Sequence, residues 1–141
     1  MSVSEHAHEL DRGLEQGRQL LEGIVARDWD RVAATIAPEG RFLAVVANEE
    51  HPFREHIGPE AATQQIRRWF DDSDEVALIG GQVDAVADRV RINYRIRGHD
   101  PDDGWYLIEQ LIHATPGTEG YTRMNLACSG FRPTDPGIAA H

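Results

Sequence analysis

Residues 90–113 read VRINYRIRGHDPDDGWYLIEQLIH, and this stretch decides the fold. Every second residue of its first half is apolar, which is typical of a β-strand with one buried face. The apolar residues are Val90, Ile92, Tyr94 and Ile96. The residues between them, which we expect to face away from the core, are Arg91, Asn93, Arg95 and Arg97. Turn residues and a second β-forming run follow, so the stretch predicts two long antiparallel strands.

The second run, residues 105–113, does not reveal its buried face in the same way. One alternate set contains Trp105, Leu107, Glu109, Leu111 and His113. The other contains Tyr106, Ile108, Gln110 and Ile112. Both sets are largely apolar, so periodicity alone leaves both orientations open.

Helical patterns dominate the first half of the chain. Apolar residues at helical spacing predict a long amphipathic helix over residues 4–27. Asp28 is expected to cap a short second helix, which Pro38 and Gly40 end. The Gly58-Pro59 pair predicts the start of a third helix, because proline favours the first helical position.

Extended patterns fill the second half. Residues 41–48 predict one strand before the third helix, and Gly80-Gly81 indicates a bulge within the first strand after it. The strands expected after that helix cover residues 75–87, 89–97, 105–114 and 121–131. This order predicts an α+β fold: a bent antiparallel sheet wrapped as a cone around the long N-terminal helix, with two further helices.

Composition limits the kinds of function. The 141 residues carry a net charge of −10, and all 14 basic residues are arginine. So acidic a chain is repelled by nucleic acid, and without lysine it cannot use Schiff-base catalysis. The lone Cys128 forms no internal disulfide, and neither a signal peptide nor a membrane span is predicted. We therefore expect one cytoplasmic domain over residues 1–133, followed by a flexible tail over 134–141.

Two short patterns resemble metal-binding motifs. The turn from Asp100 to Gly104 resembles a calcium loop, but Leu111 stands where the closing glutamate belongs. His6 and His8 begin the first helix without a further ligand nearby in the sequence. We expect no metal site and no cofactor.

The order of elements resembles the nuclear transport factor 2-like superfamily, which includes SnoaL-like and ketosteroid-isomerase-like proteins. The resemblance covers residues 8–133 and rests on the order and spacing of modest motifs. These are VARDWDRVAATIAPEGRF (25–42), IGPEAATQQIRRWF (57–70), ADRVRINYRIRG (87–98), WYLIEQ (105–110) and CSGFRP (128–133).

The resemblance implies an acid–base site inside the cone. It places Glu109 where ketosteroid isomerases have a protonated pocket carboxyl, with Leu107 and Leu111 beside it. A turn centred at residues 101–102 would bring Glu109 next to Asn93 or Tyr94, and the Tyr94 hydroxyl would be a second donor. The alternative places Glu109 on the outer face, paired with Arg95 or Arg97.

The chain departs from the isomerase pattern at two catalytic positions, where it has Ala44 and about Leu20. His51 or His56 could supply the missing base near the mouth of the cone. The residues expected to line the pocket are Trp29, Phe42, Asn48, Trp69, Phe70, Leu107, Leu111, His113, Met124 and Leu126.

The resemblance therefore implies a cofactor-independent enzyme acting on an apolar, oxygenated metabolite of polyketide or terpene type. The reactions would be isomerisation, cyclisation, dehydration or epoxide opening, with Glu109, Tyr94, His51 and His56 as catalytic residues. The alternative is a non-catalytic ligand-binding or assembly module on the same fold. In either case we expect a homodimer through the outer sheet face, where Arg91, Arg95 and Arg97 could pair with acids of a partner.

Overall fold

The structure is a computed structural model that describes residues 3–46 and 53–134. Its helices are α1 (Val3–Ala26), α2 (Trp29–Ala33) and α3 (Pro59–Phe70). The predicted cap of α2 is confirmed, since the Asp28 side chain accepts a hydrogen bond from the backbone N–H of Arg31. The predicted start of α3 is also confirmed, with Pro59 in the first turn.

One sheet contains every described strand. The strands are β1 (Ile36–Val46), β2 (Phe53–Ile57), β3 (Glu75–Val86), β4 (Arg89–Asp100), β5 (Gly104–Thr115), β6 (Tyr121–Cys128) and β7 (Arg132–Pro133). Their spatial order is β2-β1-β6-β5-β4-β3, with β7 paired to β5. The pairs are antiparallel except β1 with β6, which is parallel, so the sheet is mixed rather than wholly antiparallel.

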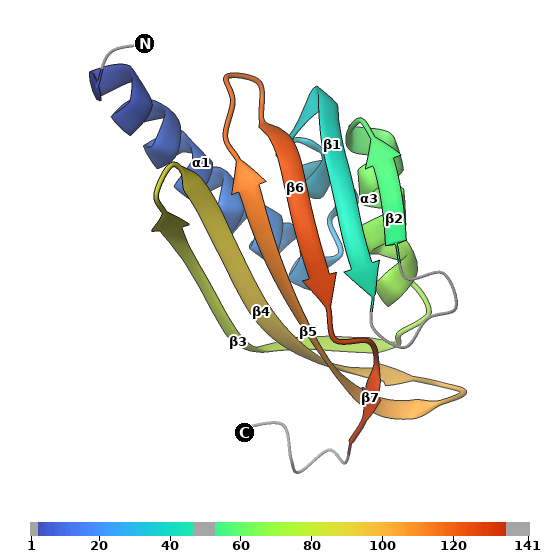
Figure 1. The fold of residues 1–141 in the computed structure, drawn as a ribbon. Helices are drawn as coiled ribbons and strands as arrows, with labels where there is room; N and C mark the ends of the chain where they lie inside the picture. The colour runs from blue at the N-terminus through green and yellow to red at the C-terminus, as the bar shows by residue number, and fades with distance from the viewer. Residues whose placement is uncertain (1–2, 47–52, 135–141) are drawn as a thin grey trace.

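The helices cover one face of a strongly bent sheet (Figure 1). α1 packs on β3 and β4, α3 packs on β1 and β2, and α2 contacts both long helices. The predicted α+β cone is therefore confirmed. The apolar core lies between the helices and the concave face of the sheet, where Leu20, Ile24, Ile66 and Phe70 are fully buried.

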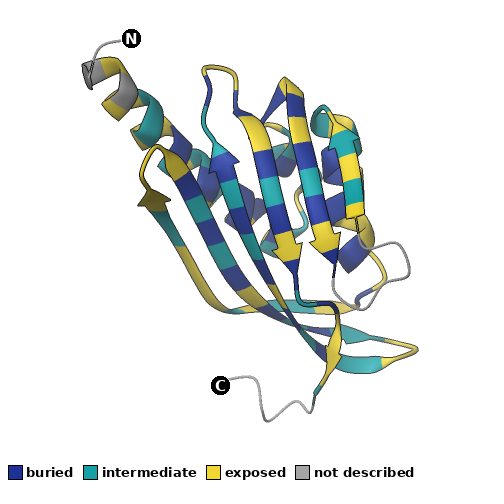
Figure 2. Ribbon diagram, in the orientation of Figure 1, coloured by how far each residue is buried: buried dark blue, intermediate teal, exposed yellow. Residues whose placement is uncertain are grey.

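Burial alternates along the central strands, as Figure 2 shows for β4 and β6. The predicted inward set of β4 is confirmed, because Val90, Ile92, Tyr94 and Ile96 have no exposed surface. On β5 the buried set is Tyr106, Ile108, Gln110, Ile112 and Ala114. The predicted bulge of β3 is confirmed too, by a shift of register between Leu78 and Gly80.

Several predicted boundaries are wrong. β1 begins at Ile36 rather than at residue 41, so Pro38 and Gly40 lie within the strand and do not end a helix. Gly40 is needed there because a Cβ would stand 2.6 Å from the carbonyl oxygen of Tyr121 on the neighbouring strand. The predicted last strand, 121–131, ends at Cys128, and β7 forms a separate short strand.

The expected domain limits are not tested by these observations. Residues 1–2 and 135–141, and therefore most of the expected tail, lie outside the described residues. Within the described part of the chain, no helix is both long enough and apolar enough to cross a membrane.

Candidate functional site

Three side chains form a buried polar group on the concave face of the sheet. Tyr94 on β4 donates its hydroxyl hydrogen to Oε1 of Gln110 on β5. The amide Nε2 of Gln110 in turn lies 3.4 Å from Sγ of Cys128 on β6, which also accepts from the backbone N–H of Gly130 at 3.4 Å. We call Tyr94, Gln110 and Cys128 the interior trio. Adjacent strands hold it in place, since Tyr94 pairs with Gln110 and Gln110 with Cys128 in the sheet register.

Burial decides the charge state of the tyrosine in the trio. Desolvation raises the pKa of Tyr94 far above its usual value, and the neighbouring Cys128 raises it further. The tyrosine therefore remains a neutral hydrogen-bond donor at any physiological pH. A neutral phenol beside a primary amide can polarise a carbonyl oxygen, but neither group is a base.

The structure corrects the predicted orientation of Glu109. Its side chain is exposed on the outer face, where Oε2 lies 3.0 Å from a guanidinium nitrogen of Arg95. The turn of the β4–β5 hairpin is centred on Asp102, so Glu109 pairs with Arg95 rather than with Asn93 or Tyr94. The inward polar residue of this strand is Gln110, which sequence reasoning did not select.

Three predicted pocket residues share the orientation of Glu109. Leu107, Leu111 and His113 alternate with the buried residues of β5, so their side chains project from the outer face and are only partly buried. The prediction that they line the cone interior is therefore wrong. The cause is the choice of which alternate set of β5 residues faces the core. The wrong set places every side chain of the strand on the opposite face of the sheet.

Other predicted pocket residues do face the interior. Phe42, Phe70, Met124 and Leu126 are buried core residues, Trp69 is 8% exposed, and Trp29 is partly buried against the same core. Their orientation agrees with the prediction, and contact with a ligand stays a prediction. Asn48 and His51 lie outside the described residues.

His56 lies beside Phe42, one of these interior residues. It pairs with Phe42 across β1 and β2, which places both rings on one face of the sheet with centroids 6.3 Å apart. Its Nε2 lies 3.2 Å from Oε1 of Gln65 on α3. His56 is half-buried, and among the described side chains named in these two paragraphs its imidazole is the one best suited to carry a proton.

A second feature is a hollow of about 490 Å³ at the tip of the β4–β5 hairpin. We call it the hairpin hollow. Its lining comprises Arg68, Trp69, Asp72, Ser73, Asp100, Asp103, Gly104, Trp105, Tyr106, Phe131 and Pro133. Volumes of this size accommodate small organic ligands. Sequence reasoning did not predict this site, because its residues come from α3, the hairpin and the segment after β6.

Among the described residues, no group of three or more His, Cys, Asp or Glu side chains is arranged to hold an ion. The acidic turn that resembles a calcium loop is instead closed by Asp100, whose Oδ1 accepts from the backbone N–H groups of Asp102 and Asp103.

Comparison with solved structures identifies the class of fold. A candidate isomerase from Bacillus subtilis has a TM-score of 0.70 and 13% identity, over 86% of this chain and 88% of that one. A candidate polyketide cyclase from Xanthomonas campestris has a TM-score of 0.64 and 20% identity, over 84% and 91% of the two chains. An NTF2-like protein from Burkholderia xenovorans has a TM-score of 0.63 and 12% identity, over 84% and 90%.

The chain therefore has the nuclear transport factor 2-like fold, as its sequence predicts. No protein-family model matches the chain, and no curated protein does so either. Identities this low establish the fold alone, and fold does not imply function. The activity must be argued from the site.

Proposed function

We propose that this protein is a SnoaL-like enzyme that binds an apolar, oxygenated metabolite in the cone and catalyses proton transfer next to a carbonyl group. The observation that carries the proposal is the interior trio, a neutral hydrogen-bonding group buried on the concave face. Such a group in apolar surroundings suits stabilisation of a developing oxyanion. The fold shared with a candidate polyketide cyclase and a candidate isomerase supports the same reaction class.

Each role follows from the chemistry of the side chain. Tyr94 would turn its hydroxyl from Gln110 to the substrate oxygen, and the Gln110 amide would be the second donor. A base would remove the proton from the carbon next to the carbonyl, leaving an enolate whose negative oxygen these donors stabilise. His51 and His56 are the predicted candidates for this base, and the sheet register sets His56 four residues along the strands from the row of the trio, about 13 Å. Glu109 has no part in this mechanism because it faces outward.

Hydrogen exchange of a simple ketone tests the proposal. The probe is 2-tetralone in D₂O, because enolate formation replaces its α-protons with deuterium and proton NMR follows their loss. Acceleration by the protein is expected. Tyr94→Phe should reduce it by a factor of about 10² or more, and so should replacement of the histidine that is the base by glutamine. Glu109→Gln should leave it unchanged. Equal exchange with and without the protein would contradict proton-transfer catalysis on such a ketone.

One observation favours a second candidate, a binding module without catalysis. Besides the tyrosines and Cys128, the buried polar side chains among the described residues are Thr35, Thr63, Gln65, Ser73 and Gln110, none of which carries a charge. Hydroxyl and amide groups can orient a ligand but cannot remove a proton. Saturable binding of 2-tetralone without accelerated exchange would support this candidate.

Assembly through the outer face stays a prediction. Arg91 donates to both carboxylate oxygens of Asp84, at 2.9 and 2.6 Å, and Arg95 pairs with Glu109. Arg91 and Arg95 thus form ion pairs within their own chain. These pairs do not favour the predicted pairing of the two arginines with acids of a partner. Light scattering of the wild type and of Arg95→Glu would test the predicted dimer.

A further inference from the structure

The floor of the hairpin hollow is built from two hydroxyl groups. Oγ of Ser73 and Oη of Tyr106 lie 2.6 Å apart, and both residues are largely buried. Arg27, just after α1, donates to the carbonyl oxygen of Ser73 at 2.5 Å and fixes this segment. The Tyr106 ring lies directly over Gly98, where a Cβ would stand only 2.2 Å from it. The hydroxyl pair is therefore held at a defined position.

Aromatic rings form the walls. Phe131 packs against Tyr106 edge to face, with centroids 4.9 Å apart, and leaves 45% of its surface exposed. Trp69 at the end of α3 and Trp105 on β5 also line the hollow. Trp105 is held on β5 by contacts with Arg97, whose guanidinium lies 5.1 Å from the ring centroid, and with His99. Ring faces at fixed positions offer π-electron density to a ligand.

Acidic side chains outnumber basic ones among the residues that line the hollow, while the guanidinium groups of Arg97 and Arg27 contact Trp105 and Ser73 from outside this lining. Three carboxylates, from Asp72, Asp100 and Asp103, line the hollow together with one basic side chain, Arg68. Asp100 and Asp103 belong to the tight turn that Asp100 closes, so their backbone is fixed relative to Trp105. The whole chain adds a net charge of −10, which raises the local concentration of small cations.

We propose that the hairpin hollow binds a small organic cation, an alkylammonium with apolar substituents. Aromatic rings attract an ammonium group through their quadrupole, and carboxylates at the rim provide the opposite charge. The hydroxyl pair on the floor can hydrogen-bond a polar substituent. An organic anion would be repelled by the three carboxylates, and a neutral ligand would gain no attraction between opposite charges from them.

This site is distinct from the interior trio. Gly98 is four residues beyond Tyr94 on β4, which at the rise of a β-strand is about 13 Å. Binding in the hollow therefore does not depend on the proposed proton transfer, and each proposal can fail without the other.

Titration calorimetry with a matched pair of ligands tests the proposal. The probes are choline and 3,3-dimethylbutan-1-ol, which have the same shape but differ in that only choline is charged. Choline should bind with 1:1 stoichiometry and at least tenfold more tightly than the alcohol. Phe131→Leu and Asp103→Asn should each weaken choline binding about fivefold.

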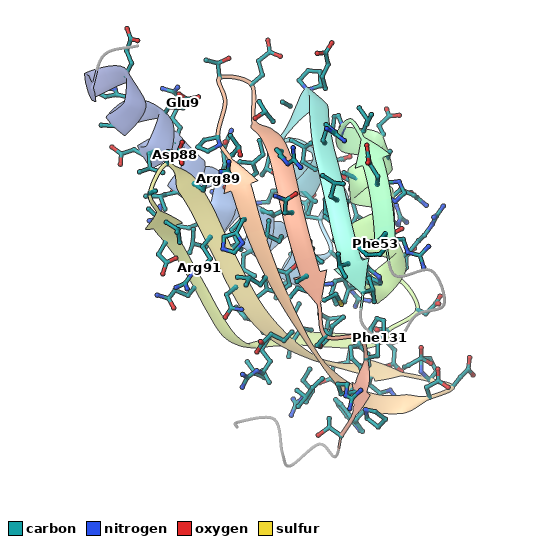
Figure 3. The ribbon with its side chains drawn as sticks, in the orientation of Figure 1. Glu9, Phe53, Asp88, Arg89, Arg91 and Phe131 are labelled. Atoms are coloured by element: carbon teal, nitrogen blue, oxygen red, sulfur yellow. The ribbon has the colours of Figure 1, made fainter. Side chains whose placement is uncertain are left out.

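Two controls separate a specific site from general attraction to an acidic protein. Asp88→Asn removes one negative charge at the β3–β4 turn, at the opposite end of the sheet from Phe131 (Figure 3), and should leave choline affinity unchanged. Tyr94→Phe should also leave it unchanged. Equal affinities for choline and the alcohol, no binding of choline, or equal losses for Asp88→Asn and Asp103→Asn would each overturn the proposal.

Discussion

Two adjacent rungs of the β4–β5 ladder have opposite chemistry. Tyr94 and Gln110 are paired on the inner face, and both are fully buried. The next rung pairs Arg95 with Glu109 on the outer face, where both side chains are more than 40% exposed. The inner rung is a neutral hydrogen bond and the outer rung is an ion pair.

The difference shows how burial selects the kind of polar pair. A charge on the inner rung would lose its hydration, whereas a neutral pair has only its hydrogen bonds to satisfy. On the outer face water screens the ion pair, so it contributes little to stability. The inner rung should therefore respond strongly to changes that create a buried charge or an unsatisfied group, and the outer rung weakly.

Alkaline pH should have the largest effect on the stability of the fold, because it favours ionisation of the buried tyrosines. Burial raises the pKa of all three tyrosines, Tyr94, Tyr106 and Tyr121, above the ordinary value of 10.0. The native state therefore keeps protons that the unfolded chain releases, and stability falls as pH rises above about 10. Each tyrosine contributes up to about 1.4 kcal/mol per pH unit.

Phenolate absorbance should consequently appear together with the loss of circular dichroism, in one cooperative transition. Three tyrosines that ionise near pH 10 while the circular dichroism stays native would contradict this. The outer rung contains no tyrosine and should play no part in the transition.

Gly98→Ala should have the next largest effect, because it disturbs the strands that carry both rungs. The new Cβ would stand 2.2 Å from Cζ and Oη of Tyr106, its partner on β5. Relief requires the ring or the strand to move, at a cost of about 3 kcal/mol in urea denaturation. Gly80→Ala on β3 is the matched control, since its Cβ would meet nothing within 4 Å. Equal stability of the two variants would refute the close packing of Tyr106 on Gly98.

Tyr94→Phe should destabilise the inner rung by about 1–2 kcal/mol, because Oε1 of Gln110 loses its donor inside the core. The measurement is again urea denaturation. Adding Gln110→Leu should recover part of the loss, since both polar partners are then replaced by apolar groups. A double variant that is less stable than the sum of the single changes would contradict the pairing.

Glu109→Gln should change stability least, by under about 1 kcal/mol, because the outer ion pair is exposed. The difference from wild type should vanish in roughly 1 M salt, where screening acts over about 3 Å. A loss that equals that of Tyr94→Phe would mean that the two rungs do not differ in the way the structure indicates.

The two strands also differ in how well their sequences predict them. Residues 90–97 alternate apolar groups with three arginines and one asparagine, so only one face can be buried and the prediction is correct. On β5, Leu107 and Leu111 lie on one face, and Ile108 and Ile112 lie on the other. Both faces are apolar, so hydrophobicity does not indicate which of them is buried. The choice of Glu109 for the interior therefore rests on the resemblance to ketosteroid isomerases, and the turn predicted at residues 101–102 is centred on Asp102 in the structure.

The hairpin hollow was not predictable for a different reason. Ser73, Trp105 and Phe131 lie more than twenty residues apart in the sequence, and no local pattern relates them. Their meeting depends on the bend of β4 and β5 towards the end of α3 (Figure 1). The pairing of β1 with β6 also joins segments that are far apart in the sequence. No local pattern indicates that these two strands run parallel.

The sequence by itself determined the order of the helices and of the strands other than β2 and β7, the starts of α2 and α3, and the inner face of β4. These features depend on neighbouring residues, whose spacing and turn chemistry are readable along the chain. Only the tertiary structure decided which face of β5 is buried, that Gln110 rather than Glu109 meets Tyr94, and where the aromatic hollow forms. Those features depend on register and curvature, which are set by the packing of the whole sheet against its helices.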